Sequence, residues 1–367
     1  MTTTGGTGVG ANTAAVVLVG GQGSRLRPLT ASTPKPMLPT AGVPFIGHLL
    51  SRIAEAGIRR VVLGTSYRAE VFADYLGDGS GFGLELECVP EPEPLGTGGG
   101  IRHAAAALDA SHDEVMVFNG DILSGVDLGA VLAEHRGSGA DATLHLVRVA
   151  DPTAFGCVPT DPTGRVEAFL EKTLNPPTDQ VNAGCYVFRR EVIDAIPGGR
   201  PVSVERETFP GLLHDGRRLQ GHVEASYWLD LGTPQAFVRG CADLVQGIAP
   251  TSALPGPVGK ALMLEGAKTA ATATCSDGTT LGRDVVVGDG SHVIGSVVMD
   301  GARIGDNVTI TRSVIGPGAV IGDDTVVHDA VVGDDVTVGS GCELREGVRL
   351  WPGLSIPDGG LRFSGSA

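Results

Sequence analysis

Residues Val16–Pro39 read VVLVGGQGSRLRPLTASTPKPMLP and combine a strand, a glycine-rich turn and a group of cations. The apolar run Ala14–Val19 has the length and the β-branched content of a buried strand. The glycines that follow can bring backbone N–H groups close to a ligand, because they carry no Cβ. Arg25, Arg27 and Lys35 add three cations to a chain whose net charge is −15. This combination is typical of a loop that holds a polyphosphate.

The spacing of the glycines excludes two common phosphate-binding loops. The P-loop requires G-x-x-x-x-G-K-[ST], and no lysine follows the glycines here. The dinucleotide fingerprint requires G-x-G-x-x-G, and although Gly21 and Gly23 fit it, Leu26 occupies its last position. The sequence therefore predicts a phosphate loop of a different kind.

Length and composition describe a globular protein with more than one domain. The chain has 367 residues, of which 42% are hydrophobic, which is enough for two or three cores. No apolar run approaches the roughly 18 residues of a transmembrane helix. The sequence pI near 5.0 argues against a nucleic-acid or an anionic-membrane partner. Residues 1–12 lack the basic and apolar regions of a signal peptide and are expected to form a flexible tail.

The cysteine pattern favours a reducing compartment. The six cysteines are scattered along the chain and none of them forms a C-x-x-C pair. Buried, reduced thiols are the usual state of such residues, so a cytoplasmic location is expected.

Residues 13–247 are predicted to form one α/β domain. Strand-like runs alternate with helical patterns, which predicts a mostly parallel, Rossmann-like sheet with helices on both faces. Ligands of such sheets bind beyond the carboxyl ends of the strands. Gly20 and Asp121 each follow a predicted strand, so we expect them to share one crevice.

The C-terminal part of the chain has a short repeat. Residues 248–273 contain three prolines and are predicted to be a linker. In residues 274–360, aliphatic residues recur five or six positions apart, commonly followed by glycine. This is the hexapeptide period of a left-handed parallel β-helix, with residues 361–367 as a tail. A rod of this kind suggests subunit contacts, and a homo-oligomer is expected.

The opening motif resembles the sugar-1-phosphate nucleotidylyltransferases, whose pattern is GG-x-G-T-R-L-x-P-L-T…P-K-P. Ser24 replaces the threonine and keeps its hydroxyl. The resemblance extends over nearly the whole chain and is nearest to the guanylyltransferase branch with a C-terminal β-helix. It rests on these later segments: EPEPLGTGGG at 91–100, FGCV at 155–158, FLEKT at 169–173, NAGCY at 182–186 and YWLDLGTP at 227–234.

The resemblance implies transfer of GMP from GTP to mannose 1-phosphate, with GDP-mannose and pyrophosphate as products. It implies catalytic roles for Arg25 and Lys35, which face the phosphates, and for Asp121 and Asp230, which hold Mg²⁺. Mg²⁺ uses one or two carboxylates together with substrate phosphate oxygens, so two aspartates suffice. No covalent intermediate is needed, because positioning and charge neutralisation carry phosphoryl transfer.

The resemblance also implies two sets of binding residues. The expected nucleotide site consists of Leu18, Gly20, Gly21, Gly23, Ser24, Glu91, Gly96 and Thr97. The expected sugar-phosphate site consists of Gly156, Glu171, Lys172, Asn182 and Gly184. A carboxylate at Glu91, or secondarily at Glu93, can accept both N–H donors along the edge of guanine.

Several alternative functions stay open. Heptose-1-phosphate guanylyltransferases and glucose-1-phosphate thymidylyl- or uridylyltransferases share parts of the motif set. Hexapeptide β-helices also occur in acyltransferases, which need a histidine base, and His292 and His328 lie in the repeats. A non-catalytic regulator would keep this fold and lose the cations and carboxylates, which this sequence retains.

Overall fold

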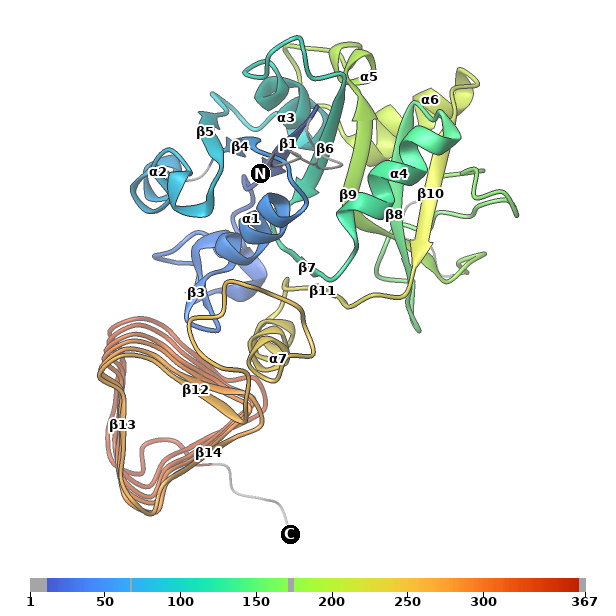
Figure 1. Ribbon diagram of the computed structural model, residues 1–367. Helices are drawn as coiled ribbons and strands as arrows, with labels where there is room; N and C mark the ends of the chain where they lie inside the picture. Colours follow the sequence, from blue (N-terminus) through green and yellow to red (C-terminus); the bar gives the residue numbers. More distant parts are fainter. Residues whose placement is uncertain (1–11, 67, 171–174, 363–367) are drawn as a thin grey trace, which may run out of the picture. The chain divides into compact units, whose positions relative to one another are not determined.

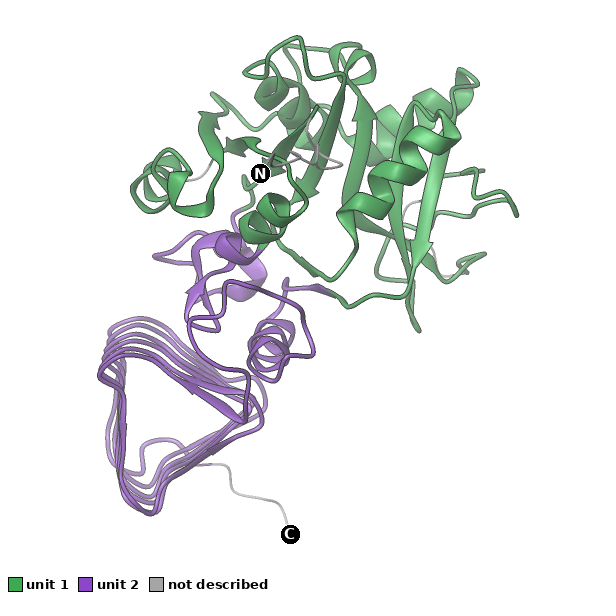
Figure 2. Ribbon diagram, in the orientation of Figure 1, with its two compact units in different colours: residues 1–21, 49–228 green, residues 22–48, 229–367 purple. Residues whose placement is uncertain are grey.

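The protein divides into two compact units (Figure 2). The computed structural model describes residues 12–66, 68–170 and 175–362. Unit 1 comprises residues 1–21 and 49–228, and unit 2 comprises residues 22–48 and 229–367. The residues that follow Gly21, among them Gly23, Arg25 and Lys35, therefore belong to the same unit as the C-terminal repeats. Across the described ranges, no helix has both the length and the apolar character needed to cross a membrane.

Unit 1 is built on a seven-stranded sheet with the order β10-β8-β9-β6-β1-β4-β5 (Figure 1). β9 runs antiparallel to β6 and β8, and the other neighbouring pairs are parallel, so the predicted mostly parallel sheet is confirmed. The strands of this sheet are β1 (Thr13–Leu18), β4 (Arg60–Thr65), β5 (Glu85–Pro90), β6 (Glu114–Asn119), β8 (Ala142–Arg148), β9 (Gln180–Arg189) and β10 (Leu219–Glu224).

Helices cover both faces of this sheet. Side chains alternate along β8, so Leu144 and Leu146 enter the main core, while Thr143 faces the opposite side and bonds His135 of α4. Helices α3, α5 and α6 contribute to the main core. The helices of both units, within the described residues, are α1 (Phe45–Glu55), α2 (Ala69–Leu76), α3 (Gly96–Ala105), α4 (Leu128–Ser138), α5 (Arg190–Asp194), α6 (Phe209–His214) and α7 (Pro234–Val245), with the π-helix η4 (Val204–Thr208) and the 3₁₀ turns η1 (Ser24–Leu26), η2 (Lys35–Met37) and η3 (Ser80–Phe82). Of these, α7, η1 and η2 belong to unit 2.

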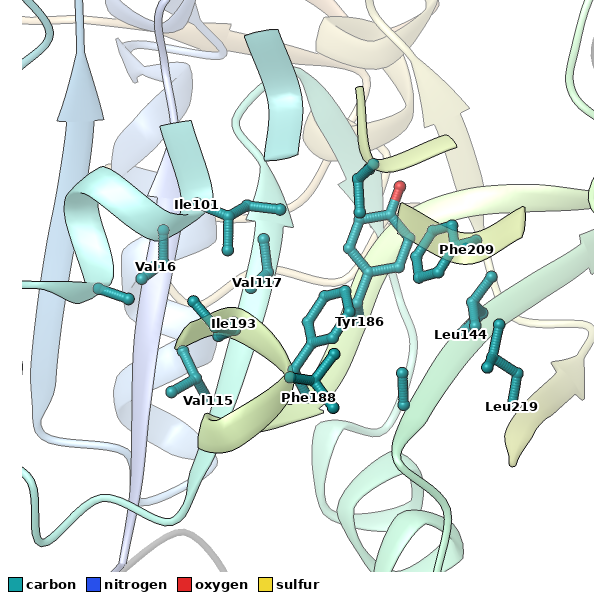
Figure 3. Packing of buried hydrophobic residues seen from close by; sticks show 14 of the residues in the cluster. Val16, Ile101, Val115, Val117, Leu144, Tyr186, Phe188, Ile193, Phe209 and Leu219 are labelled. Carbon is teal, nitrogen blue, oxygen red and sulfur yellow. The ribbon is translucent and has the colours of Figure 1, made fainter. Parts of the chain in front are cut away.

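An aromatic cluster occupies the core between β9 and α6 (Figure 3). The rings of Phe188 and Phe209 stack with their centroids 5.7 Å apart and their planes 3° apart. Tyr186 meets Phe209 edge-on at 5.3 Å. These rings are fully buried and fix the conformation of β9, which carries part of the predicted sugar site.

Unit 2 contains a three-sided parallel β-helix, as predicted from the hexapeptide period. Three sheets of parallel strands follow the orders β12-β15-β18-β21-β24-β27, β13-β16-β19-β22-β25-β28 and β14-β17-β20-β23-β26. In most of the short strands, one aliphatic residue points into a continuous interior, which the rows Val298–Ile315–Val332 and Val287–Ile304–Ile321 exemplify. The repeating interior row is what buries each coil against the next.

The β-helix begins before residue 274. Strands β12 and β13 lie within residues 248–273, where the sequence predicted a linker, and they pair with β15 and β16. The strands are β12 (Ala261–Met263), β13 (Lys268–Thr269), β14 (Thr274–Ser276), β15 (Thr279–Leu281), β16 (Val286–Val287), β17 (His292–Ile294), β18 (Val297–Val298), β19 (Arg303–Ile304), β20 (Thr309–Thr311), β21 (Val314–Ile315), β22 (Val320–Ile321), β23 (Val326–His328), β24 (Val331–Val332), β25 (Thr337–Val338), β26 (Glu343–Leu344), β27 (Arg349–Leu350) and β28 (Ser355–Ile356).

Aspartates at the corners explain why the repeats are acidic. Asp284, Asp324 and Asp335 adopt positive φ angles, a conformation that Asp tolerates better than most residues. Elsewhere, Asp306 and Asp323 accept backbone N–H bonds across one coil, at 2.8 Å each, from residues 17 positions earlier. These carboxylates stabilise corners, so the negative charge of this region is structural.

The remaining short elements are strands of two or three residues. β2 (Pro39–Thr40) and β3 (Val43–Pro44) form a small antiparallel hairpin in unit 2. β7 (Ile122–Ser124) follows Asp121, and β11 (Trp228–Asp230) ends at Asp230. Both predicted catalytic aspartates therefore stand at the end of a short strand, Asp121 just before β7 and Asp230 as the last residue of β11.

Candidate active site

The glycine-rich turn after β1 is held in shape by hydroxyl groups. In unit 1, Ser66 Oγ donates a hydrogen bond to the carbonyl oxygen of Gly20 at 2.7 Å. In unit 2, Thr30 Oγ1 donates to the carbonyl oxygen of Gly23 at 2.8 Å. Gly23 has a φ of +58°, and a Cβ there would lie about 3 Å from Thr30 and Lys35. Glycine at position 23 therefore allows the loop to close over Lys35.

Arg25, Lys35 and Asp230 form one charged cluster within unit 2. Arg25 Nη2 lies 3.9 Å from Asp230 Oδ2, and Lys35 Nζ lies 3.5 Å from Asp230 Oδ1. The Lys35 side chain is 10% exposed, whereas that of Arg25 is 67% exposed. One carboxylate thus faces two cations, of which one is enclosed by protein and the other projects into solvent. Such a cluster has a net positive charge and can attract phosphate groups.

The segment after Asp230 explains the LDLGTP pattern. A Cβ on Gly232 would lie 2.5 Å from Arg25 Nη2, so glycine leaves room for the guanidinium. Thr233 caps α7 by accepting a hydrogen bond from the Ala236 N–H at 3.2 Å. The glycine and the cap together set where Asp230 leaves its strand and where α7 begins.

Asp121 lies in unit 1 beyond the paired ends of two neighbouring strands. Leu18 of β1 is in register with Asn119 of β6, and the Gly120 N–H donates to the Leu18 carbonyl at 2.9 Å. Gly20 and Asp121 each follow these paired residues by two positions. Both residues therefore stand at the same edge of the sheet, and the crevice that they are expected to share stays a prediction.

Leu18 and Glu91 meet beside Gly100 in unit 1. A Cβ on Gly100 would lie 2.5 Å from Glu91 Oε1 and 3.5 Å from Leu18 Cδ2. The other carboxylate oxygen, Oε2, accepts a hydrogen bond from the Leu95 N–H at 3.1 Å. Glu93 is exposed, whereas Glu91 is partly buried. An apolar side chain and a carboxylate thus lie side by side next to the start of α3.

Gly96 and Thr97 begin α3 and contact η4 and the residues before it. A Cβ on Gly96, whose φ is +68°, would lie 2.6 Å from the Val202 carbonyl oxygen. Thr97 Oγ1 donates to Glu205 Oε2 at 2.8 Å and accepts the Val204 N–H at 2.9 Å. These contacts anchor the loop, and the nucleotide role of both residues stays a prediction.

Asn182 and Gly184 of β9 form a small polar group with Tyr186. Asn182 Nδ2 donates to the Tyr186 hydroxyl at 2.7 Å, and Asn182 Oδ1 accepts the Gly184 N–H at 3.1 Å. Gly184 has a φ of +75° and packs against Asn119. Gly156 lies nearby, since its carbonyl accepts the Asn182 N–H at 3.2 Å. Glu171 and Lys172, the other predicted sugar-phosphate residues, lie outside the described residues.

Three residues near the predicted site were missed by the sequence reasoning. Ser66 holds the Gly20 carbonyl, as described above. Burial raises the pKa of Tyr186, so its phenol stays neutral and orients Asn182. Trp228 Nε1 donates to the Ala183 carbonyl at 3.1 Å. Tyr186 and Trp228 belong to the NAGCY and YWLDLGTP motifs, so those motifs could have identified them, whereas no sequence signal singled out Ser66.

Asp230 offers an oxygen suited to a hard cation. Its Oδ1 atom is buried and accepts no hydrogen bond in the part of the chain that the structure describes, although Lys35 Nζ lies 3.5 Å away. No group of three or more His, Cys, Asp or Glu side chains suited to a metal occurs within those same ranges. A site of one or two carboxylates completed by substrate phosphate oxygens is the arrangement that Mg²⁺ commonly adopts, and Asp230 fits it.

Two family models match the chain. Residues 14–247 match the model described as nucleotidyl transferase, and residues 257–352 match the model described as GMPPB C-terminal domain. The first model covers more than half of the chain and includes every predicted site residue. The second covers most of the β-helix.

Two proteins with similar sequences are named as mannose-1-phosphate guanylyltransferases. The chain is 62% identical to the mannose-1-phosphate guanylyltransferase of Mycobacterium tuberculosis, over 95% of this chain and 97% of that protein. It is 35% identical to mannose-1-phosphate guanylyltransferase 1 of Arabidopsis thaliana, over 79% of this chain and 82% of that protein.

A solved structure with the same fold contains a guanine nucleotide analogue. HddC from Yersinia pseudotuberculosis, in complex with GMP-PN, superposes with a TM-score of 0.55 at 27% identity. The match covers 63% of this chain and 99% of that one, so it concerns one part of this chain only.

Proposed function

The chain belongs to the nucleotidyl transferase family, and we propose on this basis that it transfers GMP from GTP to mannose 1-phosphate, with GDP-mannose and pyrophosphate as products. The observation that carries the proposal is the pair of cations, Arg25 and Lys35, gathered on Asp230 beside the glycine-rich turn. The names and high identity of the relatives support the choice of nucleotide and sugar.

The cations neutralise charge as the phosphates react. An oxygen of the sugar phosphate attacks the α-phosphorus of the nucleotide in line with the departing pyrophosphate. Lys35, fixed and nearly enclosed, binds the β- and γ-phosphates, and the exposed Arg25 fork stabilises the charge on the transferring and leaving groups. The backbone of Gly20, Gly21, Gly23 and Ser24 lies along the triphosphate.

Asp230 and Asp121 are the residues that would hold Mg²⁺. The buried, unbonded Oδ1 of Asp230 supports this assignment, and Asp121 is included because it follows the end of β6 at the same edge of the sheet as Gly20. Bound Mg²⁺ supplies charge neutralisation and polarisation at the α-phosphoryl group. The protein contributes by placing Asp230 between two cations, where its carboxylate oxygens can accept a metal ion together with phosphate oxygens.

The guanine base binds between Leu18 and Glu91. Leu18 offers an apolar surface for the ring, and the carboxylate of Glu91, whose Oε1 lies beside Gly100, accepts the N1–H and N2–H donors of guanine. Gly96 and Thr97 complete the loop that carries Glu91. Uracil and thymine lack this pair of adjacent donors, so Glu91 is the residue that favours GTP.

The sugar phosphate binds along β9. Asn182, oriented by Tyr186, together with Gly156 and Gly184, contacts the sugar hydroxyls. Glu171 and Lys172 follow from the family motif, with Lys172 pairing with the phosphate.

The β-helix histidines give no support to an acyltransferase. His292 Nδ1 shares a hydrogen bond of 2.7 Å with Thr274 Oγ1. His328 Nε2 lies 2.8 Å from Arg312 and 3.1 Å from Asp329. Both rings are engaged in contacts between neighbouring coils, which is a structural use of histidine.

One experiment tests this proposal. Pyrophosphate release is measured with four NTPs against mannose, glucose and heptose 1-phosphates. GTP with mannose 1-phosphate is expected to give the highest kcat/KM, and preference for UTP or dTTP would contradict it.

A variant pair tests the base contact. Glu91→Gln should lower kcat/KM for GTP by roughly 10- to 100-fold, because an amide cannot accept both guanine donors. Glu93→Gln is the matched control, since Glu93 is exposed on the same loop. Equal loss in the two variants would remove Glu91 from base recognition.

Other expectations stay predictions. These are a homo-oligomer, a cytoplasmic location, and a catalytic domain at residues 13–247.

A further inference from the structure

The predicted phosphate-binding loop packs within the same compact unit as the β-helix. Residues 22–48, which include Arg25 and Lys35, belong to unit 2 (Figure 2). Leu26, Leu29 and Leu38 of this loop are at most 2% exposed. Their burial requires partners, and those partners come from the C-terminal part of the chain.

One face of the β-helix supplies those partners. In the sheet β12-β15-β18-β21-β24-β27, the inner residues of three successive strands fill the interior, while the outer residues Val297, Val314 and Val331 join the loop leucines in one cluster. The outer valines are at most 4% exposed. On another face, the outer residues Val286 and Val320 are 40% and 37% exposed. The burial of the first face is therefore specific to it.

Helix α7 completes the contact. Phe237, Val238 and Cys241 of α7 belong to the same cluster as the loop leucines and the outer valines. A Cβ on Gly278 would lie 2.5 Å from Ala242 Cα, so the helix rests directly against the β-helix. Because α7 begins just after Asp230, the loop cations and Asp230 are attached to one common support.

Arg349 extends the outer row and reaches the loop backbone. It is in register with Val331, so its side chain leaves the same face of the sheet. Its Nη1 atom donates to the carbonyl oxygens of Arg25 and Arg27, at 2.8 and 2.9 Å. Two residues after β24, Asp334 Oδ2 accepts a hydrogen bond from Ser32 Oγ at 2.8 Å. The hydrogen bonds of Arg349 and Asp334 therefore join the loop to the β-helix in addition to the apolar contacts of the leucines.

We infer that this face of the β-helix positions the phosphate-binding loop, and that Arg349 is a positioning residue for Arg25. The cationic Nη1 restrains the Arg25–Leu26 and Arg27–Pro28 peptide groups, and therefore the direction in which the Arg25 side chain projects. Arg25 is 67% exposed and has Asp230 as a long contact at 3.9 Å, so the backbone restraint is a major determinant of its placement. The inference rests on the proposed function of Arg25.

The first test compares Arg349 variants in the full chain. Arg349→Ala should lower kcat for pyrophosphate release roughly 10- to 100-fold, because small misplacements of a charged group are expensive for transfer. Arg349→Lys should recover much of the rate, since a single nitrogen makes both contacts in the native protein. Arg345→Ala is the control, because Arg345 lies between β26 and β27 and pairs with Glu343 of β26. Thermal unfolding is recorded for every variant, and an unchanged kcat in a folded Arg349→Ala protein overturns the inference.

A double-mutant cycle separates positioning from general structural support. If Arg349 acts through Arg25, then Arg349→Ala should lower kcat by less than about twofold in an Arg25→Ala background. Full additivity of the two effects overturns the inference. Hydrogen exchange of residues 22–38 gives a readout that does not depend on activity, and faster exchange is expected in Arg349→Ala. If the wild-type protein lacks transferase activity but residues 22–38 still exchange faster in Arg349→Ala, the proposed function is refuted and the loop restraint stands.

Discussion

Replacing Lys35 by methionine tests the charged cluster most directly. The two side chains have similar length and volume, so the change removes a charge and leaves the packing nearly intact. Lys35 is 10% exposed, and its Nζ lies 3.5 Å from Asp230 Oδ1. Asp230 keeps Arg25 as a partner at 3.9 Å, so the carboxylate is not left without a nearby cation. We therefore expect the folded state to persist.

The size of the effect follows from electrostatics. At an effective dielectric constant of about 20, two unit charges roughly 4 Å apart interact by about 4 kcal/mol. A transition state that loses about 4 kcal/mol of stabilisation reacts roughly 10³ times more slowly. Arg25 shares the same region and compensates in part, so we expect kcat/KM for the nucleotide to fall by roughly 10² to 10³, as for loss of one preorganised donor.

The assay is continuous pyrophosphate release at saturating sugar phosphate. Lys268→Met is the matched control, because Lys268 is exposed on β13. Lys35→Arg should be intermediate, since it restores the charge with a different shape. If Lys35→Met stayed folded and kept kcat/KM within about threefold of the native value, the role assigned to Lys35 would be wrong, because that change is under 1 kcal/mol.

Two further predictions concern stability. Phe209→Ala removes a ring from the centre of the aromatic cluster and should lower the free energy of unfolding, measured by urea titration, by about 3–5 kcal/mol. Tyr75→Ala is the control, because the Tyr75 side chain is 41% exposed. Similar losses of unfolding free energy in the two variants would contradict the packing argument. Burial opposes ionisation of Glu224, but hydrogen bonds from His145 and Ser226 hold its pKa at about 2, below the ordinary 4.5. A depressed carboxyl pKa stabilises the fold fully above pH 4.5, and this stabilisation disappears as pH falls toward 2. Unfolding midpoints of Glu224→Gln should accordingly depend less on pH over that range, and identical pH profiles would count against this pairing.

Local sequence patterns predict much of this fold. The strand before the glycine-rich turn and the strand before Asp121 are continuous apolar runs, and both are buried on both faces as β1 and β6. The parallel register of these strands then places Gly20 and Asp121 at one edge. Parallel strands covered by helices on both sides must be apolar throughout, so this signal is strong in sequence. The hexapeptide period was equally strong, because each coil repeats the same inward position.

Contacts between side chains far apart in the sequence were harder to predict from the sequence. Motifs identified Arg25, Lys35 and Asp230, yet the pairing of both cations with Asp230 joins residues about 200 positions apart. Thr97 is predicted to bind the nucleotide, but the sequence did not indicate that its hydroxyl contacts Glu205, in a helix with no motif of its own. Hydrogen-bond partners of this kind depend on how loops fold back, which periodicity does not encode.

The sequence by itself determined which residues of the β-helix point inward, since an alternating pattern leaves one aliphatic residue per strand for the interior. It did not distinguish Val314 from Val320, because both precede an inward isoleucine in the same way. Only the tertiary structure decided that Val314 is covered, by α7 and by loop residues nearly 300 positions earlier, while Val320 stays exposed. The physical reason is that burial of an outward side chain depends on which distant segment packs against it, and that packing is a property of the whole chain.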